Sequence, residues 1–338
     1  MKAAVLYAPY DVRIDERADP KIEQPTDALI RMSATCVCGS DLWPYRGENP
    51  IKGPTTMGHE YCGIVEEVGS AVKGVGRGQF VIGAFAYSDN TCSNCKAGYQ
   101  SGCIHGGFFN TAQAPMLRVP LADGTLVPTS GTPSAGMIPS MLTLSDVMGT
   151  GWFAADAANV GPGKTAVVVG DGAVGLLAVL SSKMLGAERI IVMSRHEARQ
   201  KLAKKFGATD VVAERGEEGI ARVKDLTRGI GADSVMECVG TQASMSQAIG
   251  SARRGGYVSY VGVPHGVTFE GQQLFYRHVH LHGGPAPVRR FLPKLIDLVE
   301  DGKMDPGKVF DLTLPLDQVA EGYRAMDERR AIKTLLQP

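Results

Sequence analysis

The sequence predicts an α/β protein of two domains, in which a β-rich domain is interrupted by a doubly wound parallel sheet. At 338 residues the chain is longer than one hydrophobic core usually accommodates. Its first 150 residues are rich in Gly and Pro and contain short β-branched runs, which is typical of an irregular β domain with many turns. From Thr165 onward, short apolar runs alternate with helical patterns, which indicates βαβ units and a parallel sheet.

These changes in pattern give the predicted domain boundaries. We assign residues 1–150 to the β-rich domain, which is completed by 291–338, and residues 151–290 to the parallel-sheet domain. The expected strands are 61–68, 79–82, 166–169, 189–193, 233–239, 257–263, 278–282 and 332–336, and the expected helices are 146–159, 174–185, 197–206, 243–252 and 318–329.

The composition excludes several classes of partner. Acidic and basic residues balance at 35 each, so nothing electrostatic favours nucleic acid or an anionic membrane. The first twenty residues are too charged for a secretory signal, and the longest apolar stretch, around 172–182, is too short to span a bilayer. We therefore expect a soluble, cytoplasmic protein without a nucleic-acid or membrane partner.

Cysteine usage indicates metal or redox chemistry. An odd number of cysteines in a long chain without a signal argues against a disulfide framework. Several of them are closely spaced, as metal ligands often are. The seven are Cys36, Cys38, Cys62, Cys92, Cys95, Cys103 and Cys238.

A dinucleotide-binding fingerprint follows the strand expected at 166–169. The sequence there is Gly170-Asp171-Gly172-Ala173-Val174-Gly175, and an apolar helix comes next. In this Gly-x-Gly-x-x-Gly pattern the first glycine permits the tight turn and the second lets the pyrophosphate approach the backbone. The third allows close helix–sheet packing, and the helix N-terminus attracts the phosphate charge. The strand–turn–helix setting predicts a Rossmann nucleotide site.

The end of the next strand indicates which nucleotide binds. A carboxylate there would bind the ribose 2′-hydroxyl of NAD, but strand 189–193 is followed by Ser194 and Arg195, with no carboxylate before Glu197. A hydroxyl and a guanidinium suit a 2′-phosphate, which favours NADP(H) over NAD(H). Alternatively, Arg195 is a solvated residue that opens the next helix. Arg215 is a second candidate for the phosphate.

Two motifs in the β-rich domain carry potential zinc ligands: residues 38–41 read Cys-Gly-Ser-Asp and residues 58–60 read Gly-His-Glu. Thiolate and imidazole are zinc ligands, although a single Cys or His is more often a core residue. Together with the fingerprint and the ending Ile332-Lys333, these motifs resemble the zinc-dependent medium-chain dehydrogenase/reductase family. The resemblance covers essentially the whole chain and is closest to the bacterial NADP-dependent secondary-alcohol branch. It implies a GroES-like catalytic domain with a Rossmann domain, and a homodimer or homotetramer.

By this resemblance, Cys38, His59 and Asp146 are ligands of a catalytic zinc, and Glu60 is a carboxylate that can approach or exchange at the metal. Asp146 lies just before the pair Thr150-Gly151, at a position that is Cys in many relatives. A carboxylate oxygen is an acceptable zinc ligand. Asp146 could otherwise cap the helix that follows.

A second cluster resembles the structural zinc lobe of the family, which has four cysteines. Here the first is replaced, so that the set is Asp89, Cys92, Cys95 and Cys103. Either the aspartate completes a zinc tetrahedron or the lobe has lost its metal. A short loop without metal would have to be held by packing alone, which favours a retained site.

The resemblance also implies the chemistry. Zinc acts as a Lewis acid on the substrate oxygen while the nicotinamide exchanges a hydride with the substrate. Ser40 matches the hydroxyl that takes the substrate proton, unless it is an ordinary turn serine. Thr150 and Val174 match positions lining the nicotinamide, and Lys333 matches one near the pyrophosphate.

Two competing interpretations stay open at this point. One is a zinc-free NADPH-dependent quinone or enone reductase, and the other is an NADP(H)-binding protein without turnover. Neither needs Cys38, His59 and Asp146 together. Trp43 stands where many relatives place a proton-relay histidine, and Phe85 and Phe108 lie near the motifs as candidate pocket residues.

Overall fold

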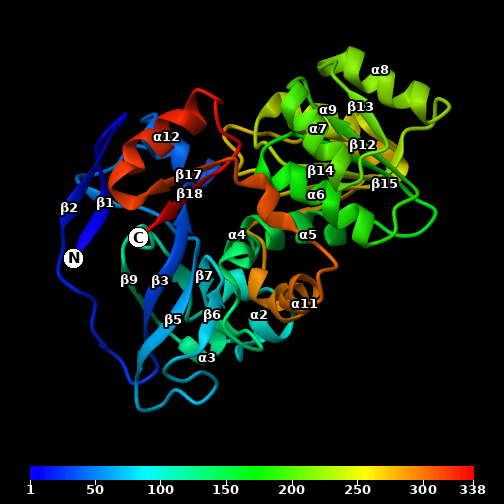
Figure 1. The fold of residues 1–338 in the computed structure, drawn as a ribbon. Coiled ribbons are helices and arrows are strands. Elements are labelled where there is room, and N and C mark those ends of the chain that lie inside the picture. Colours follow the sequence, from blue (N-terminus) through cyan, green and yellow to red (C-terminus); the bar gives the residue numbers. More distant parts are fainter. The chain divides into compact units, whose positions relative to one another are not determined.

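The structure is a computed structural model that describes all residues, 1–338. The chain divides into two compact units (Figure 1). Unit 1 comprises Met1–Gly149 and Pro287–Pro338, and unit 2 comprises Thr150–Ala286. No helix is both long enough and apolar enough to cross a membrane.

Unit 1 is built on a seven-stranded sheet that joins both ends of the chain. The strands lie in the order β10 (Leu126–Pro128), β6 (Phe80–Gly83), β5 (Tyr61–Val68), β3 (Ala28–Cys36), β18 (Thr334–Gln337) and β17 (Leu312–Pro315), with β9 (Met116–Val119) also paired to β3. In Figure 1 the red strand β18 runs beside the blue strand β3. The C-terminal residues therefore complete the N-terminal sheet.

Two smaller sheets and several short helices complete unit 1. The sheets are β2 (Asp11–Glu16), β1 (Lys2–Ala8) and β4 (Thr55–Thr56), and β7 (Ala86–Tyr87) with β8 (Gly107–Phe108). The helices are α1 (Leu42–Tyr45), α2 (Ser93–Lys96), α3 (Ala122–Thr125), α4 (Ile138–Thr143), α11 (Val288–Glu300) and α12 (Val319–Asp327). Helix α5 (Val147–Ala157) contains the boundary between the units.

Unit 2 is a six-stranded parallel sheet with helical crossovers. The strand order is β13 (Asp210–Val212), β12 (Arg189–Met193), β11 (Thr165–Val169), β14 (Ala232–Glu237), β15 (Ala252–Tyr260) and β16 (His280–Gly283). The helices are α6 (Ala173–Met184), α7 (Glu197–Phe206), α8 (Gly216–Leu226), α9 (Gln242–Ser251) and α10 (Gly271–Arg277). The order reverses at β11, and such a switch point is where doubly wound sheets bind nucleotides.

The predicted α/β class with a doubly wound parallel sheet is confirmed. Strands β5 and β12 and helix α7 have the predicted bounds. Strand β13 and helix α8 were not predicted from the sequence, because three residues of strand give no periodic signal and α8 is mostly polar. Strand β15 begins at Ala252 rather than at residue 257, because two glycines interrupt its apolar pattern.

Candidate functional site

The antiparallel pairing of β3 with β5 brings the two predicted zinc-ligand motifs together. Thr35 pairs with Tyr61, and the Thr35 hydroxyl donates a hydrogen bond to the Glu60 carbonyl at 2.8 Å. Cys38 follows the end of β3, and His59 precedes the start of β5. The sheet register, rather than sequence proximity, therefore sets a thiol beside an imidazole.

Asp146 reaches the same place through its neighbour Ser145. The Ser145 hydroxyl donates to the Gly83 carbonyl at 2.6 Å and accepts from the Tyr61 N–H at 3.0 Å, which fixes this segment against β5 and β6. The Asp146 carboxylate, directly before α5, then points at Cys38 and His59. Its Oδ2 atom lies 3.5 Å from Cys38 Sγ and 3.2 Å from His59 Nε2.

These distances fit a tetrahedral zinc ion. Ligands at about 2.0–2.3 Å around a tetrahedral ion stand about 3.3–3.8 Å from one another. The donor atoms of Cys38, His59, Glu60 and Asp146 all lie within 4.8 Å of one another, and all four residues are buried or half-buried. We call this set the inner cluster. Its donor types and spacing are those of a zinc site.

The imidazole of His59 is oriented from its other side. Asp41 Oδ1 lies 3.3 Å from His59 Nδ1, which leaves Nε2 directed at Asp146. Asp41 Oδ2 also accepts the Cys38 N–H at 3.0 Å. The preceding Gly58 has φ +92°, and a Cβ there would stand 2.5 Å from the Gln113 side chain, so only glycine fits this turn. Asp41 thus supports two donors of the inner cluster.

Glu60 has a buried partner that the sequence patterns did not reveal. The Lys333 ammonium lies 2.6 Å from Glu60 Oε1 and donates to the Val37 carbonyl at 3.2 Å, and both charged side chains are fully buried. The pairing of β18 with β3 brings them together. To contact a pyrophosphate, Lys333 would have to leave these partners, so that predicted role stays a prediction.

The electrostatics of the inner cluster reflect crowded acidic groups. Burial raises the pKa of the Cys38 thiol, and the charges of Asp146 and Glu60 raise it further. Burial lowers the pKa of His59, but the charges of Asp41 and Cys38 outweigh that effect, and the pKa lies well above its ordinary value. Several potential anions share one buried volume, and a divalent cation would neutralise them.

The remaining predicted residues of this site lie around the cluster. Ser40 lies in the 3-10 turn Gly39–Asp41, is half-buried, and its hydroxyl makes no hydrogen bond within the protein. The ring of Phe85 packs edge-on against His59 with centroids 6.2 Å apart, and Phe108 stacks on Phe85 at 6.0 Å. The cluster therefore has a free hydroxyl and an apolar wall nearby.

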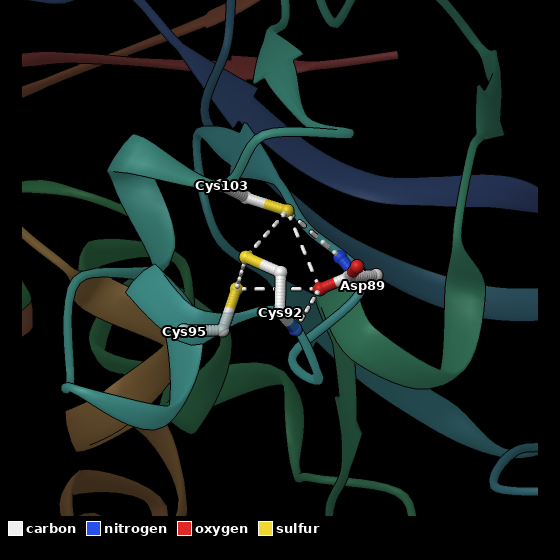
Figure 2. A group of neighbouring side chains, drawn as sticks. All are labelled: Asp89, Cys92, Cys95 and Cys103. Carbon is white, nitrogen blue, oxygen red and sulfur yellow. Dashed lines mark hydrogen bonds between the residues drawn. The ribbon is translucent and has the colours of Figure 1, made fainter.

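The second predicted cluster forms a compact group, which we call the outer lobe (Figure 2). Cys92 Sγ lies 3.5 Å from Cys95 Sγ and 3.9 Å from Cys103 Sγ. Asp89 Oδ1 lies 3.4 Å from both Cys95 Sγ and Cys103 Sγ. Figure 2 shows the three sulfurs and this oxygen converging. The spacing again matches the edges of a zinc tetrahedron.

Asp89 is held in place on its other side. The Thr91 and Cys92 N–H groups donate to Oδ1, and His105 Nδ1 lies 2.6 Å from Oδ2. Burial opposes ionisation, but these hydrogen bonds lower the pKa of the Asp89 carboxyl well below its ordinary value. Hydrogen bonds from backbone N–H groups of Cys95 and Ile104 lower the pKa of the Cys92 thiol to about 7. Both donors are thus suited to binding a cation at neutral pH, whereas burial and the neighbouring donors raise the pKa of the Cys95 thiol.

The fingerprint in unit 2 forms the turn that its glycines predict. Gly172 is the N-cap of α6, and Ala173 and Val174 open the helix half-buried. A Cβ on Gly175 would stand 2.3 Å from the Gly170 carbonyl oxygen, so the helix could not approach the strand with any larger residue. The N–H groups of the first turn of α6 are available to a phosphate.

The two residues predicted to read the 2′-phosphate differ in exposure. Arg195 is exposed and makes no hydrogen bond or ion pair. Ser194 is buried and donates from its hydroxyl to Asp171 Oδ2 at 2.7 Å. Arg199 Nη1 lies 3.3 Å from Asp171 Oδ1. Sequence reasoning did not single out Asp171 or Arg199 for this site. Thr150, predicted to line the nicotinamide, is buried in α5.

Comparison with known proteins assigns the family. The model of the alcohol dehydrogenase GroES-like domain matches residues 24–130, and that of the zinc-binding dehydrogenases matches residues 173–301. A probable zinc-binding alcohol dehydrogenase of Mycobacterium tuberculosis is 36% identical over 96% of this chain and 84% of its own length. The chain belongs to the zinc-dependent medium-chain alcohol dehydrogenases. This confirms the predicted family and the GroES-like and Rossmann architecture.

Solved structures agree with this assignment. An alcohol dehydrogenase from Thermus sp. ATN1 is 30% identical with a TM-score of 0.92, covering 100% of this chain and 99% of that one. A putative zinc-binding dehydrogenase from Sinorhizobium meliloti 1021, bound to NADP, is 25% identical with a TM-score of 0.82, covering 100% and 99%. The protein is thus a zinc-dependent oxidoreductase, and both competing interpretations are disfavoured.

Proposed function

We propose that this protein transfers a hydride between NADP(H) and a small alcohol, ketone or aldehyde, at a zinc ion held by Cys38, His59 and Asp146. The observation that carries the proposal is the spacing of one sulfur, one nitrogen and one carboxylate oxygen at the distances of a tetrahedral site. Three protein ligands leave one position open for substrate, as catalytic zinc sites do.

Each neighbouring residue has a distinct task in this proposal. Bound zinc would supply a Lewis acid for the substrate oxygen, and the nicotinamide would supply or accept the hydride. The unpaired Ser40 hydroxyl accepts the alcohol proton while it passes its own proton on toward solvent, and Asp41 keeps His59 oriented. Phe85 and Phe108 form an apolar wall that suits an alkyl or aryl substrate. Trp43 cannot relay a proton, so the proton leaves through water, the ribose hydroxyl or another residue.

Glu60 has a separate task, because Lys333 holds it in a buried ion pair. The pair holds this carboxylate away from the substrate side of the cluster. With zinc bound, Glu60 would stand close enough to serve as an additional ligand, since its oxygen lies within 4.8 Å of the other donors.

The preference for NADP(H) rests on the end of β12. Arg195 offers an exposed guanidinium without a partner, and no carboxylate follows the strand until Glu197. A free guanidinium binds a phosphate dianion through charge-assisted hydrogen bonds. The relative bound to NADP shows that this fold can accept the nucleotide. In this proposal unit 2 binds the nucleotide, with Thr150 and Val174 lining the nicotinamide, and unit 1 provides the catalytic groups.

We further propose that the outer lobe holds a second, structural zinc through Asp89, Cys92, Cys95 and Cys103. Three thiols and one carboxylate at tetrahedral spacing support this assignment. We expect the assembled protein to be a homodimer or homotetramer, which its mass in solution tests.

The test of the proposed function is an NADPH-consumption screen over ketones and aldehydes. We expect turnover that disappears on treatment with a chelator and returns on addition of Zn²⁺. Activity that survives complete zinc removal would contradict the proposal. For the cofactor, the double substitution Ser194→Asp with Arg195→Leu should move the preference toward NADH, and an unchanged preference would remove these residues from the proposal.

A further inference from the structure

An acidic side chain within the fingerprint turn is joined to the end of the neighbouring strand. Asp171 is the second residue of the fingerprint, and its side chain is buried. Its Oδ2 accepts a hydrogen bond from the Ser194 hydroxyl at 2.7 Å, and its Oδ1 lies 3.3 Å from Arg199 Nη1. These contacts link the turn after β11 to the residue after β12 and to helix α7.

The position of this carboxylate is significant because of the sheet register. Val169 pairs with Met193, so β11 and β12 end side by side. In this fold the residue that follows the second strand faces the adenosine ribose, and an acid there binds the 2′-hydroxyl. The chain has Ser194 at that place. Asp171 delivers a carboxylate to the same place from the adjacent turn.

The contact with Asp171 limits the hydrogen bonds that the Ser194 hydroxyl can make to a ligand. A hydroxyl has one proton, and Ser194 donates it to Asp171, so toward a ligand this side chain can only accept. Ser194 is 1% exposed and Asp171 is 7% exposed, so the carboxylate is the more accessible acceptor for a ribose 2′-hydroxyl. A 2′-phosphate dianion has no proton to donate and is repelled by the Asp171 charge.

The positive charges of Arg199 and Arg195 favour binding of the 2′-phosphate, in contrast to Asp171. The Arg199 guanidinium lies against the carboxylate with its side chain mostly buried, and therefore offsets part of the negative charge. Arg195 is exposed and unpaired, and remains free for a phosphate. One site thus combines an acid that suits the 2′-hydroxyl with a free cation that suits the 2′-phosphate.

We propose that Asp171 is a specificity-determining residue that favours NAD(H) over NADP(H), and that Arg199 tempers its effect. This deepens the proposed function and rests on it, because it takes the nucleotide to occupy the fingerprint turn. The protein binds both nucleotides, and the balance between them is set by Asp171 on one side and Arg195 on the other.

The test is to measure the Kd of NADPH and of NADH by nucleotide fluorescence, without substrate, on the full chain. Asp171→Asn removes the charge at constant shape, and should raise the affinity for NADPH relative to NADH by about tenfold. Arg199→Gln removes the positive charge that offsets the Asp171 carboxylate, and should lower the affinity for NADPH relative to NADH. If Asp171 had only a structural role, its replacement would lower the affinity for both nucleotides equally, and the ratio of the two affinities would not change.

The matched control is Asp210→Asn, which removes a carboxylate paired with Arg189. Asp210 is the first residue of β13 and therefore lies at the amino ends of the strands, away from the carboxyl ends where Asp171 lies. The ratio of its affinities for NADPH and NADH should equal that of the wild type. An unchanged or lower ratio in a folded Asp171→Asn variant overturns the proposal. If that variant fails to fold, an unchanged ratio in folded Arg199→Gln overturns it instead.

The same titrations separate this proposal from the proposed cofactor preference. A wild-type protein that binds NADH more tightly than NADPH contradicts the preference, while the ratios of the variants still decide the role of Asp171. A wild-type protein that binds neither nucleotide overturns both.

Discussion

The two metal clusters of unit 1 use similar donors but are assembled in different ways. The donors of the outer lobe all come from one segment, residues 89–103, and its cysteines are positioned by short turns. The inner cluster collects Cys38, His59 and Asp146 from three distant segments that the main sheet aligns. In our proposal a zinc ion would help to fold the outer lobe, whereas the main sheet already positions the donors of the inner cluster without metal. The consequences of losing each ion should therefore differ.

The two clusters also differ in how much of the surrounding structure is buried. The outer lobe has few buried side chains of its own, so the proposed zinc ion would stabilise it in place of a hydrophobic core. The inner cluster is embedded in a sheet whose core residues, among them Tyr61 and Ile82, are fully buried. We therefore expect the inner ion to matter mainly for turnover and the outer ion mainly for folding.

The largest effect is expected from Cys38→Ser in the inner cluster. Loss of a zinc ligand should lower kcat for ketone reduction by about a thousandfold or more, since a Lewis acid is worth several kcal/mol. The Kd of NADPH and the melting temperature should stay near the wild-type values. Cys62→Ser, a buried thiol of β5 outside the cluster, is the matched control and should keep most of the activity. Loss of nucleotide binding together with turnover would indicate a folding defect and contradict the assignment.

A smaller effect, of a different kind, is expected from Cys95→Ser in the outer lobe. The zinc content should fall from about two ions per chain to about one. The melting temperature should fall by roughly 5 °C, as expected for a loss of about 2 kcal/mol in a domain of this size. Turnover measured well below the new melting temperature should remain within about tenfold. Metal analysis that finds one zinc ion in the wild type would show that Asp89 does not complete the lobe.

The smallest effect is expected from His105→Gln, which removes the imidazole behind Asp89. The partner of a metal-binding side chain typically contributes 10–100-fold in metal affinity, so the Kd of the lobe for zinc should rise by about that factor. Competition with a chromophoric chelator measures it. His265→Gln, which changes a half-buried histidine of unit 2, should leave the affinity unchanged. If the wild type, His105→Gln and His265→Gln bound zinc with equal affinity, the contact of His105 with Asp89 would not contribute to zinc binding.

Local patterns allowed much of the fold and one of the clusters to be predicted from the sequence. The apolar run of β12 and the amphipathic α7 were found with their observed bounds. The close spacing of its cysteines indicated metal or redox chemistry in the outer lobe, and the resemblance to the family identified Asp89 as the fourth donor. These signals are local, because the residues that form each element are neighbours in the chain.

Nonlocal contacts were not predictable in the same way. Nothing in the spacing of Cys38 and Asp146 indicates that they meet, and only the resemblance to a family suggested it. The pair Lys333 and Glu60 and the contact of Asp171 with Ser194 depend on the register of neighbouring strands and on side-chain direction. A one-residue shift in register would turn these side chains to the opposite face.

The most direct test of the inner cluster is a crystal structure of the zinc-loaded protein, with anomalous diffraction collected at the zinc absorption edge. We predict a peak about 2.0–2.3 Å from Cys38 Sγ, His59 Nε2 and an oxygen of Asp146. A peak confined to the outer lobe, with these three side chains pointing away from one another, would contradict the assignment.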